Sequence, residues 1–132
     1  MFRVMQMGLG PIGCRVAQLI SKREDLELVG AVDIAPDKIG KRVGEVCGFD
    51  CPNNLVISGD LEPLRDWYPD VAVVTTSSHI GALLNQIRPI ILARVSVVST
   101  CEELAYPTTE SAAVWKEMDG LARSKSVGVL GT

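Results

Sequence analysis

The sequence predicts an α/β fold, a single domain of 132 residues with a doubly wound parallel sheet. Short apolar runs alternate with segments whose apolar residues have helical spacing. A glycine-rich turn, Gly8-Leu9-Gly10-Pro11-Ile12-Gly13, joins the first apolar run to the first helix. The second apolar run ends in Asp33, about 20 residues further on. A strand, glycine turn, helix, strand and acid in this order are typical of a Rossmann-type dinucleotide site.

The glycine turn predicts a binding loop for a pyrophosphate. Gly8 supplies a positive φ where the strand turns, Gly10 lets the backbone approach the pyrophosphate, and Gly13 lets the helix pack close to the strand. Pro11 fits the first helical position, and the free N–H groups at that end of the helix face the phosphates. We therefore predict cofactor contacts at Gly8, Gly10, Pro11, Ile12 and Gly13.

Asp33 is predicted to hold the adenosine ribose of the cofactor. An acid at the end of the second strand accepts hydrogen bonds from both ribose hydroxyls. The alternative interpretation is a turn-forming aspartate before Pro36.

A basic cluster follows at Lys38, Lys41 and Arg42, in a stretch that predicts a loop and a short helical turn. In one interpretation the cluster, Lys38 first, meets the 2′-phosphate of NADP. In the other it is a solvated surface. The sequence therefore predicts NAD or NADP as the cofactor and does not choose between them.

The remaining apolar runs complete a sheet of about six strands, expected in the order 3-2-1-4-5-6 with right-handed crossovers. The run at 71–75 is β-branched and continuously apolar, which is typical of a strand covered on both faces. The predicted strands are residues 4–7, 26–32, 54–58, 71–75, 95–99 and 127–130, and the helices after the first are 61–68, 79–94 and about 108–125.

Polar residues gather where two of these strands end, at the edge where open parallel sheets bind ligands. Thr76 and Ser77 follow the strand at 71–75, where cofactor contact and helix capping are compatible roles. His79 is the only histidine. The sequence pattern shows no partner for it, so we expect a solvated or capping role rather than general acid or base chemistry.

The next strand brings a second polar group to the same edge. It ends at Ser99 and is followed by Thr100, Cys101, Glu102 and Glu103. Two adjacent carboxylates are suited to a cationic substrate, but acids at the start of a turn or helix are also common. None of these patterns identifies a catalytic residue.

Composition excludes several function classes. Hydrophobic residues make up 47% of the chain and the net charge is −3, and no basic tract or long apolar run is present. These features argue against nucleic acid and membranes as partners. The four cysteines, Cys14, Cys47, Cys51 and Cys101, have no spacing typical of a metal site. We expect reduced thiols in a cytoplasmic protein, with a bridge between Cys47 and Cys51 disfavoured.

The sequence resembles the N-terminal nucleotide-binding domain of the dihydrodipicolinate reductase group, and within it the 2,4-diaminopentanoate dehydrogenases. The resemblance spans essentially the whole chain. Its motifs are Gly8-Leu9-Gly10-Pro11-Ile12-Gly13, Val29-Gly30-Ala31-Val32-Asp33, Gly40-Lys41-Arg42-Val43-Gly44-Glu45-Val46-Cys47-Gly48 and Cys101-Glu102-Glu103-Leu104. The last motif favours the diamine enzymes, because reductases of lysine synthesis usually carry a loop of small residues and threonine there.

The resemblance implies an NAD(P)-dependent oxidoreductase of amino-acid metabolism that deaminates a short diamino acid oxidatively. It implies that Thr76 and Ser77 lie over the ribose and pyrophosphate of the cofactor, and that Ser99 to Cys101 lie near the nicotinamide. Family members continue into a second domain, which binds substrate and builds the oligomer and which in the reductases carries a histidine and lysine catalytic motif. We therefore expect residues 1–132 to be the cofactor domain of a longer homo-oligomeric enzyme, inactive alone.

Three alternatives stay open. The first is a dihydrodipicolinate reductase of lysine biosynthesis. The second is a non-catalytic module that senses a dinucleotide. The third is a domain for another adenosine ligand, such as S-adenosylmethionine, although a helix that starts with proline at the glycine turn favours a pyrophosphate.

Overall fold

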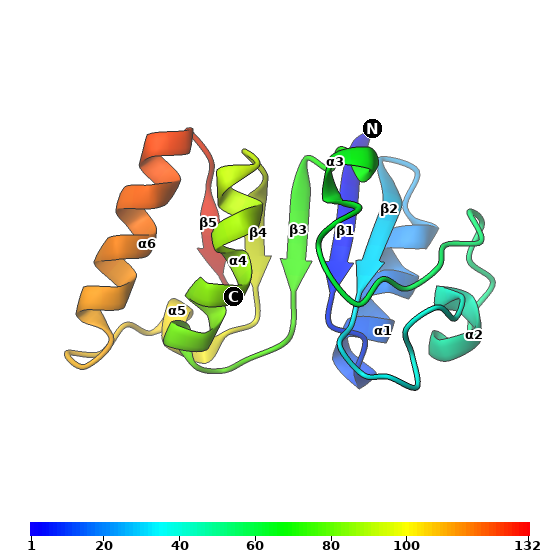
Figure 1. The fold of residues 1–132 in the computed structure, drawn as a ribbon, viewed down its shortest axis with the longest axis horizontal. Coiled ribbons are helices and arrows are strands. Elements are labelled where there is room, and N and C mark those ends of the chain that lie inside the picture. Colours follow the sequence, from blue (N-terminus) through cyan, green and yellow to red (C-terminus); the bar gives the residue numbers. More distant parts are fainter. The chain divides into compact units, whose positions relative to one another are not determined.

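A computed structural model describes residues 1–132 as two compact units, residues 1–75 and 76–132 (Figure 1). The first unit contains β1 (Phe2–Met7), α1 (Pro11–Lys22), β2 (Leu26–Val32), α2 (Val43–Cys47), α3 (Leu64–Trp67) and β3 (Val71–Val74). The second contains α4 (Ile80–Leu92), β4 (Ser96–Ser99), α5 (Glu102–Ala105), α6 (Ala112–Lys125) and β5 (Val129–Gly131). None of the helices combines the length and the apolar character that a membrane span requires.

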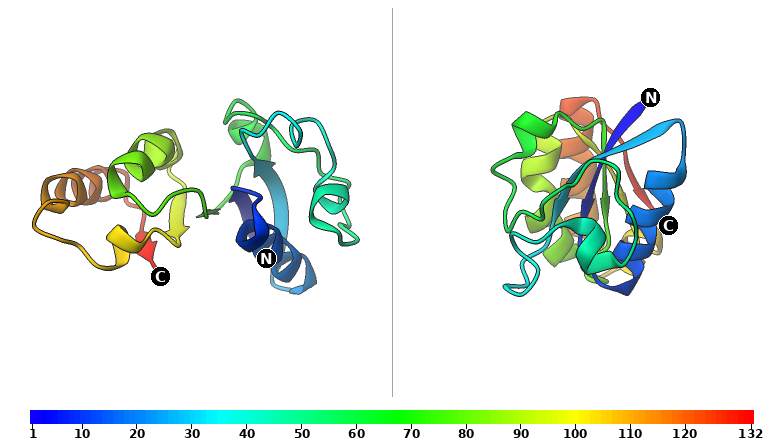
Figure 2. Two further views of the ribbon diagram at one scale, coloured as in Figure 1. Left: turned by 90° about the horizontal axis from the view of Figure 1, so that it is seen from below. Right: turned by 90° about the vertical axis from the view of Figure 1, so that its right-hand side faces the viewer.

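The first unit is built on β1, which pairs in parallel with β2 on one side and β3 on the other. Residues Val4 to Met7 of β1 are all buried, as the predicted first strand requires. The helices α1 and α3 lie on opposite sides of β1 and β2 (Figure 2). Trp67 of α3 packs directly on Gly30 of β2. A side-chain carbon at Gly30 would overlap with the indole ring. Trp67 is thus a packing residue.

One apolar cluster joins α1, the strands and α2. Its residues are buried, and two of them, Cys51 and Ile57, come from the segment between α2 and α3. Its buried members are Val4, Leu9, Ala17, Ile20, Leu28, Ala31, Val43, Cys51 and Ile57. The glycine turn is therefore anchored in the core through Leu9, which is 1% exposed.

The predicted strand at 54–58 is wrong. The segment forms isolated bridges, parallel between Val32 and Ser58 and antiparallel between Arg42 and Val56. A continuous strand does not form because the segment pairs with two different neighbours and Asn54 has a φ of 49°. The chain thus has five strands, not six. Ser58 still lies beside β2, so the first unit keeps the predicted order of its strands.

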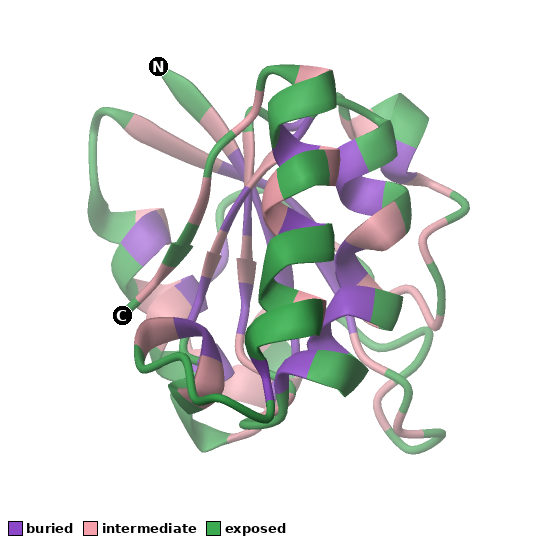
Figure 3. Cartoon of the chain, turned by 90° about the vertical axis from the view of Figure 1, so that its left-hand side faces the viewer, coloured by how far each residue is buried: buried purple, intermediate pink, exposed green.

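The second unit is smaller, with β4 and β5 paired in parallel as predicted. Helix α4 packs against α6 and buries one apolar face (Figure 3). That face contains Ile90, whereas Leu92 is half-exposed. Helix α6 begins at Ala112, later than predicted, because Thr108 and Ser111 hydrogen-bond each other in a turn. Within each unit, the order and parallel direction of the strands confirm the predicted fold class.

Candidate functional site

The glycine turn has the geometry that its sequence predicts. Gly8 has a φ of 96°, a conformation that favours glycine, and its N–H donates to the carbonyl of Val32 at 2.8 Å. A side-chain carbon at Gly13 would overlap with the carbonyl oxygen of Gly8 and lie 2.9 Å from the hydroxyl of Thr75. These two glycines are therefore required by the fold itself.

Gly10 differs from the other two glycines. Its φ is −74°, which any residue adopts, and nothing lies within 4 Å of the position that its side chain would take. It is the N-cap of α1, Pro11 is the first helical residue as predicted, and no side chain caps the helix end. The first N–H groups of α1 are thus open to a ligand beside Gly10.

The carboxylate of Asp33 accepts hydrogen bonds from two backbone N–H groups, one in the glycine turn and one two residues after Asp33. One carboxylate oxygen accepts the N–H of Leu9 at 2.7 Å, and the other accepts the N–H of Ala35 at 2.9 Å. Its side chain is only 13% exposed. The bond to Ala35 is the turn before Pro36 that the alternative interpretation predicted, whereas the bond that joins the end of β2 to the glycine turn was not predicted.

Lys38 completes this arrangement. Its ammonium donates to the carbonyl of Leu9 at 2.9 Å and lies 3.9 Å from the carboxylate of Asp33. Its charge is therefore already partly compensated, whereas Lys41 and Arg42 are exposed and form no side-chain hydrogen bond. Of the predicted basic cluster, the structure brings Lys38 to the glycine turn.

A surface depression of about 440 Å³ lies against the turn. The predicted residues Gly10, Pro11 and Lys38 line it, together with Leu9 and five residues that sequence reasoning missed. The missed residues are Cys14, Arg15, Gln18, Val46 and Cys47. Cys14, Arg15 and Gln18 could have been predicted from the sequence. They follow Pro11 by three, four and seven positions, and residues with this spacing lie on one face of a helix.

Cys14 of α1 and Cys47 of α2 form a disulfide. The expectation that all four cysteines are reduced is therefore wrong for this pair, while Cys51 and Cys101 are free and buried. The two bonded residues are 33 positions apart and become neighbours only through the packing of α1 on α2. No local spacing could have indicated the pairing.

Gln6 is a buried polar residue beneath the turn. Its amide donates to the carbonyl of Gly8 at 2.9 Å and to the hydroxyl of Thr75 at 3.1 Å. Its own oxygen has no hydrogen-bond partner, and the residue is 0% exposed. The sequence signal was a glutamine inside an otherwise apolar buried strand. Gln6 thus supports the turn from the core side.

Thr76 and Ser77 begin the second unit. The hydroxyl of Thr76 hydrogen-bonds the side chain of Gln86, and the hydroxyl of Ser77 accepts the N–H of His79 at 3.0 Å. His79 is the N-cap residue of α4 by position, without a capping bond from its side chain. Thr76 is exposed and Ser77 is half-buried.

His79 has a partner that the sequence pattern did not show. Its Nδ1 lies 3.1 Å from Oε1 of Glu103, a residue 24 positions later. The same oxygen accepts the N–H of Ile80 at 3.3 Å. The expected solvated or capping position is confirmed, because the side chain is 84% exposed and His79 is the N-cap residue of α4, while Glu103 is a partner in addition.

The residues after β4 divide into buried and exposed groups. Ser99 and Cys101 are buried, and the hydroxyl of Ser99 accepts the N–H of Cys101 at 3.1 Å. Thr100 and Glu102 are exposed. Glu102 and Glu103 also start the short helix α5, so the expected acidic helix start is present.

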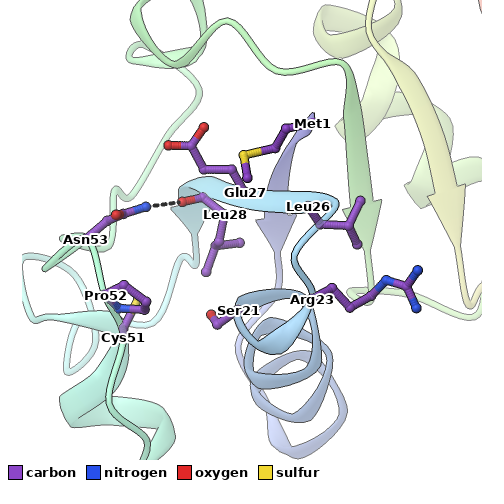
Figure 4. Close-up of a pocket in the computed structure, with 9 residues that line it drawn as sticks. All are labelled: Met1, Ser21, Arg23, Leu26, Glu27, Leu28, Cys51, Pro52 and Asn53. Carbon is purple, nitrogen blue, oxygen red and sulfur yellow. Dashed lines mark hydrogen bonds between the residues drawn. The ribbon is translucent and has the colours of Figure 1, made fainter.

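A second depression, of about 300 Å³, lies at the amino end of β2, away from the glycine turn (Figure 4). It contains none of the predicted site residues. Asn53 closes one side of it by donating to the carbonyl of Leu28 at 3.1 Å. No group of three or more histidine, cysteine or acidic side chains is placed to hold a metal ion.

The parallel strands and the braced glycine turn define the class of this chain as a Rossmann-type α/β domain. Residues 2–101 match the family described as dihydrodipicolinate reductase, N-terminus. The chain belongs to this family.

Among curated proteins, 2,4-diaminopentanoate dehydrogenase of Acetoanaerobium sticklandii is 30% identical over 98% of this chain and 37% of its own length. The 4-hydroxy-tetrahydrodipicolinate reductase of Trichormus variabilis is 38% identical over 42% of the chain and 20% of its own length. The chain thus spans well under half of the length of these relatives.

Among solved structures, an amine dehydrogenase from Mycobacterium smegmatis has a TM-score of 0.91 and 29% identity, over 99% of this chain and 39% of that one. A dipicolinate-bound dihydrodipicolinate reductase from Paenisporosarcina sp. TG-14 has a TM-score of 0.69 and 21% identity, over 98% and 46%. The predicted fold class and family are both confirmed.

Proposed function

We propose that this chain is the NAD(P)-binding domain of an oxidoreductase that oxidatively deaminates a short diamino acid, as 2,4-diaminopentanoate dehydrogenase does. The observation that carries the proposal is Gly10, where the fold requires no glycine and leaves the first N–H groups of α1 open. The relative that matches nearly the whole chain supports the diamino acid as substrate.

In this proposal the pyrophosphate binds over Gly8, Gly10 and Gly13 and against the helix end at Pro11 and Ile12. The backbone N–H groups and the positive end of the helix dipole stabilise its negative charge. Arg15 is exposed in the same depression and adds a positive charge. The cofactor itself supplies the hydride chemistry.

Asp33 serves the ribose as well as the turn. Each carboxylate oxygen has two acceptor sites, and the bonds to Leu9 and Ala35 occupy one each. The remaining sites accept the ribose hydroxyls. Because Lys38 is already bonded to Leu9, a 2′-phosphate would depend on Lys41 and Arg42, and both NAD and NADP remain compatible with the site.

We also propose that residues after β3 and β4 contact the nicotinamide half of the cofactor. Thr76, Ser77 and Thr100 are accessible for polar contacts, whereas the buried Ser99 and Cys101 shape the backbone beneath them. Glu102 or Glu103 attracts the ammonium group of the substrate. The complete enzyme is a homo-oligomer in the cytoplasm.

A steady-state assay of NADH or NADPH formation tests the proposal with 2,4-diaminopentanoate, on this chain and on a longer form that includes the sequence encoded beyond Thr132. We expect dinucleotide binding by both and turnover by the longer form only, since hydride transfer needs a substrate held against the nicotinamide away from water. A longer form that reduces the cyclic imine of lysine biosynthesis and ignores the diamine would favour the dihydrodipicolinate reductase, whose relatives match part of this chain. Binding without turnover on either substrate would favour a sensing module.

A further inference from the structure

The imidazole of His79 is held by one carboxylate that is itself anchored. Oε1 of Glu103 lies 3.1 Å from Nδ1 of His79 and accepts the N–H of Ile80 at 3.3 Å. The N–H of Glu103 donates to the carbonyl of Ser78 at 3.4 Å. Glu103 is thus bonded to both neighbours of His79 in the chain. This anchoring fixes the direction of the imidazole ring.

The partner also determines which ring nitrogen carries the proton. A carboxylate only accepts hydrogen bonds, so Nδ1 must be the donor. In the neutral ring, the lone pair is then on Nε2. The His79 side chain is 84% exposed while that of Glu103 is 34% exposed, and no protein group bonds Nε2. The pair therefore presents a free basic nitrogen to a ligand.

Glu103 of this pair lies just after the carboxyl end of a strand. Glu103 belongs to α5, which follows directly on the carboxyl end of β4. Open parallel sheets bind their ligands at this edge. The polar residues Thr76, Ser77 and Thr100 belong to the same unit. Glu102, the other charged group adjacent to the pair in sequence, is exposed.

We propose that His79 is the proton acceptor in the oxidation of the amine substrate and that Glu103 is its positioning residue. The inference rests on the proposed function. An amine carries a proton at neutral pH, and an ammonium nitrogen has no lone pair with which to form a C=N bond. Nε2 of His79 takes that proton. The carbon then loses hydride to the oxidised cofactor as the nitrogen lone pair forms an iminium ion.

The remaining steps balance the reaction. Water adds to the iminium carbon, and the adduct collapses to the ketone and an ammonium ion. In total, one substrate ammonium, one oxidised cofactor and one water give ketone, ammonium, reduced cofactor and one proton, which is the proton that His79 takes up. The negative charge of Glu103 stabilises the imidazolium that forms, as a carboxylate does in other histidine pairs.

The tautomer of His79 is directly measurable, because the chain has a single histidine. Nitrogen-15 NMR of this chain is expected to show the neutral ring protonated on Nδ1. Glu103→Ala should shift the ring to the Nε2-protonated form, which free imidazoles of histidine favour, whereas Glu102→Ala should leave the Nδ1 form in place. Backbone amide spectra check that each variant is folded. An Nε2-protonated wild type would overturn the inference.

Activity in the longer form separates this inference from the proposed function. His79→Gln should lower kcat by about 10² to 10⁴ with the affinity for NADH unchanged, because only proton transfer is removed. Added imidazole should restore part of the activity of His79→Gly.

The outcomes that contradict the two proposals differ. A wild-type protein that turns over the diamine, with His79→Gln at full rate, would overturn the role of His79 and leave the proposed function standing. A wild-type protein that binds dinucleotide but never turns over the diamine would overturn the proposed function and the role of His79 together.

Discussion

The carboxylate of Asp33 accepts the N–H of Leu9 at 2.7 Å, so the acid at the end of β2 holds the glycine turn directly. Its second oxygen holds the N–H of Ala35. In Rossmann-type domains, the acid at the end of the second strand hydrogen-bonds the ribose of the cofactor. Here the same side chain has a role before any ligand arrives, because it fixes the loop that the pyrophosphate would contact.

Asp33→Ala should therefore affect stability and binding together. It removes two hydrogen bonds to a charged group, each worth about 1.5 to 3 kcal/mol, and water replaces part of this loss, so we expect at least about 1.5 kcal/mol less free energy of unfolding. NADH affinity should fall about ten- to a hundredfold. Urea unfolding and calorimetry with NADH measure the two effects.

Asp37→Ala is the matched control for Asp33→Ala, because it removes the same charge from an exposed residue that forms no side-chain hydrogen bond. It should change neither quantity. If Asp33→Ala lowers stability but leaves NADH affinity unchanged, Asp33 serves the turn alone and its assignment to the ribose fails.

The two glycines Gly10 and Gly13 should respond in opposite ways to an added side chain. Gly10→Val should leave the fold intact and abolish dinucleotide binding, because its branch enters open space that the pyrophosphate would occupy. Gly13→Ala should destabilise the fold by about 2 kcal/mol or more, because its methyl group overlaps with the backbone of Gly8. Thermal unfolding and calorimetry distinguish the two, and wild-type affinity in a folded Gly10→Val protein would contradict the pyrophosphate assignment.

The periodicity of apolar residues was sufficient to predict the elements around the glycine turn. β2 occupies residues 26–32 as predicted, and Pro11 begins α1, because both depend on local signals. The segment 54–58 has the same local signal, Leu55-Val56-Ile57, but pairs with two different neighbours and forms no strand. A local pattern shows that a segment prefers the strand conformation. It does not show which neighbouring segments will pair with the backbone N–H and C=O groups of that segment.

The site was predictable only in part for a related reason. The glycine turn and Asp33 are encoded in short-range spacing. The pair His79 and Glu103, like the bridge from Cys14 to Cys47, joins residues that are distant in the chain. A single sequence contains no signal for such contacts, so the carboxylate partner of His79 was not predicted, and the expected reduced thiols had to be corrected for Cys14 and Cys47.

Neutralising the exposed cations Lys41 and Arg42 should change the choice of cofactor in the proposed ribose site. We expect the wild type to prefer NADH or to accept both cofactors, because Asp33 repels a 2′-phosphate. An exposed ion pair contributes up to about 1 kcal/mol, so Lys41→Gln with Arg42→Gln should lower NADPH affinity about fivefold and leave NADH affinity unchanged. Calorimetry at two salt concentrations measures this, and a strong NADPH preference that survives the double substitution would place the 2′-phosphate elsewhere.

The disulfide between Cys14 and Cys47 should stabilise the first unit. In the chain-entropy account, closing a loop of 33 residues lowers the entropy of the unfolded chain and stabilises the fold by about 3 to 4 kcal/mol. A reductant should therefore lower the unfolding midpoint of the wild type. The double variant with Cys14→Ser and Cys47→Ser should unfold at that lower midpoint with or without reductant, which controls for effects on the buried thiols of Cys51 and Cys101.

The state of this pair in the cell can be measured in the same protein. The cytoplasm keeps most thiols reduced, so a bond in the proposed cytoplasmic location has to resist that environment. Cells lysed directly into an alkylating reagent should yield protein in which Cys51 and Cys101 are alkylated after unfolding and Cys14 and Cys47 are protected. Four alkylated cysteines, together with an unfolding midpoint that does not respond to reductant, would show that the two residues pack as thiols between α1 and α2 without a bond.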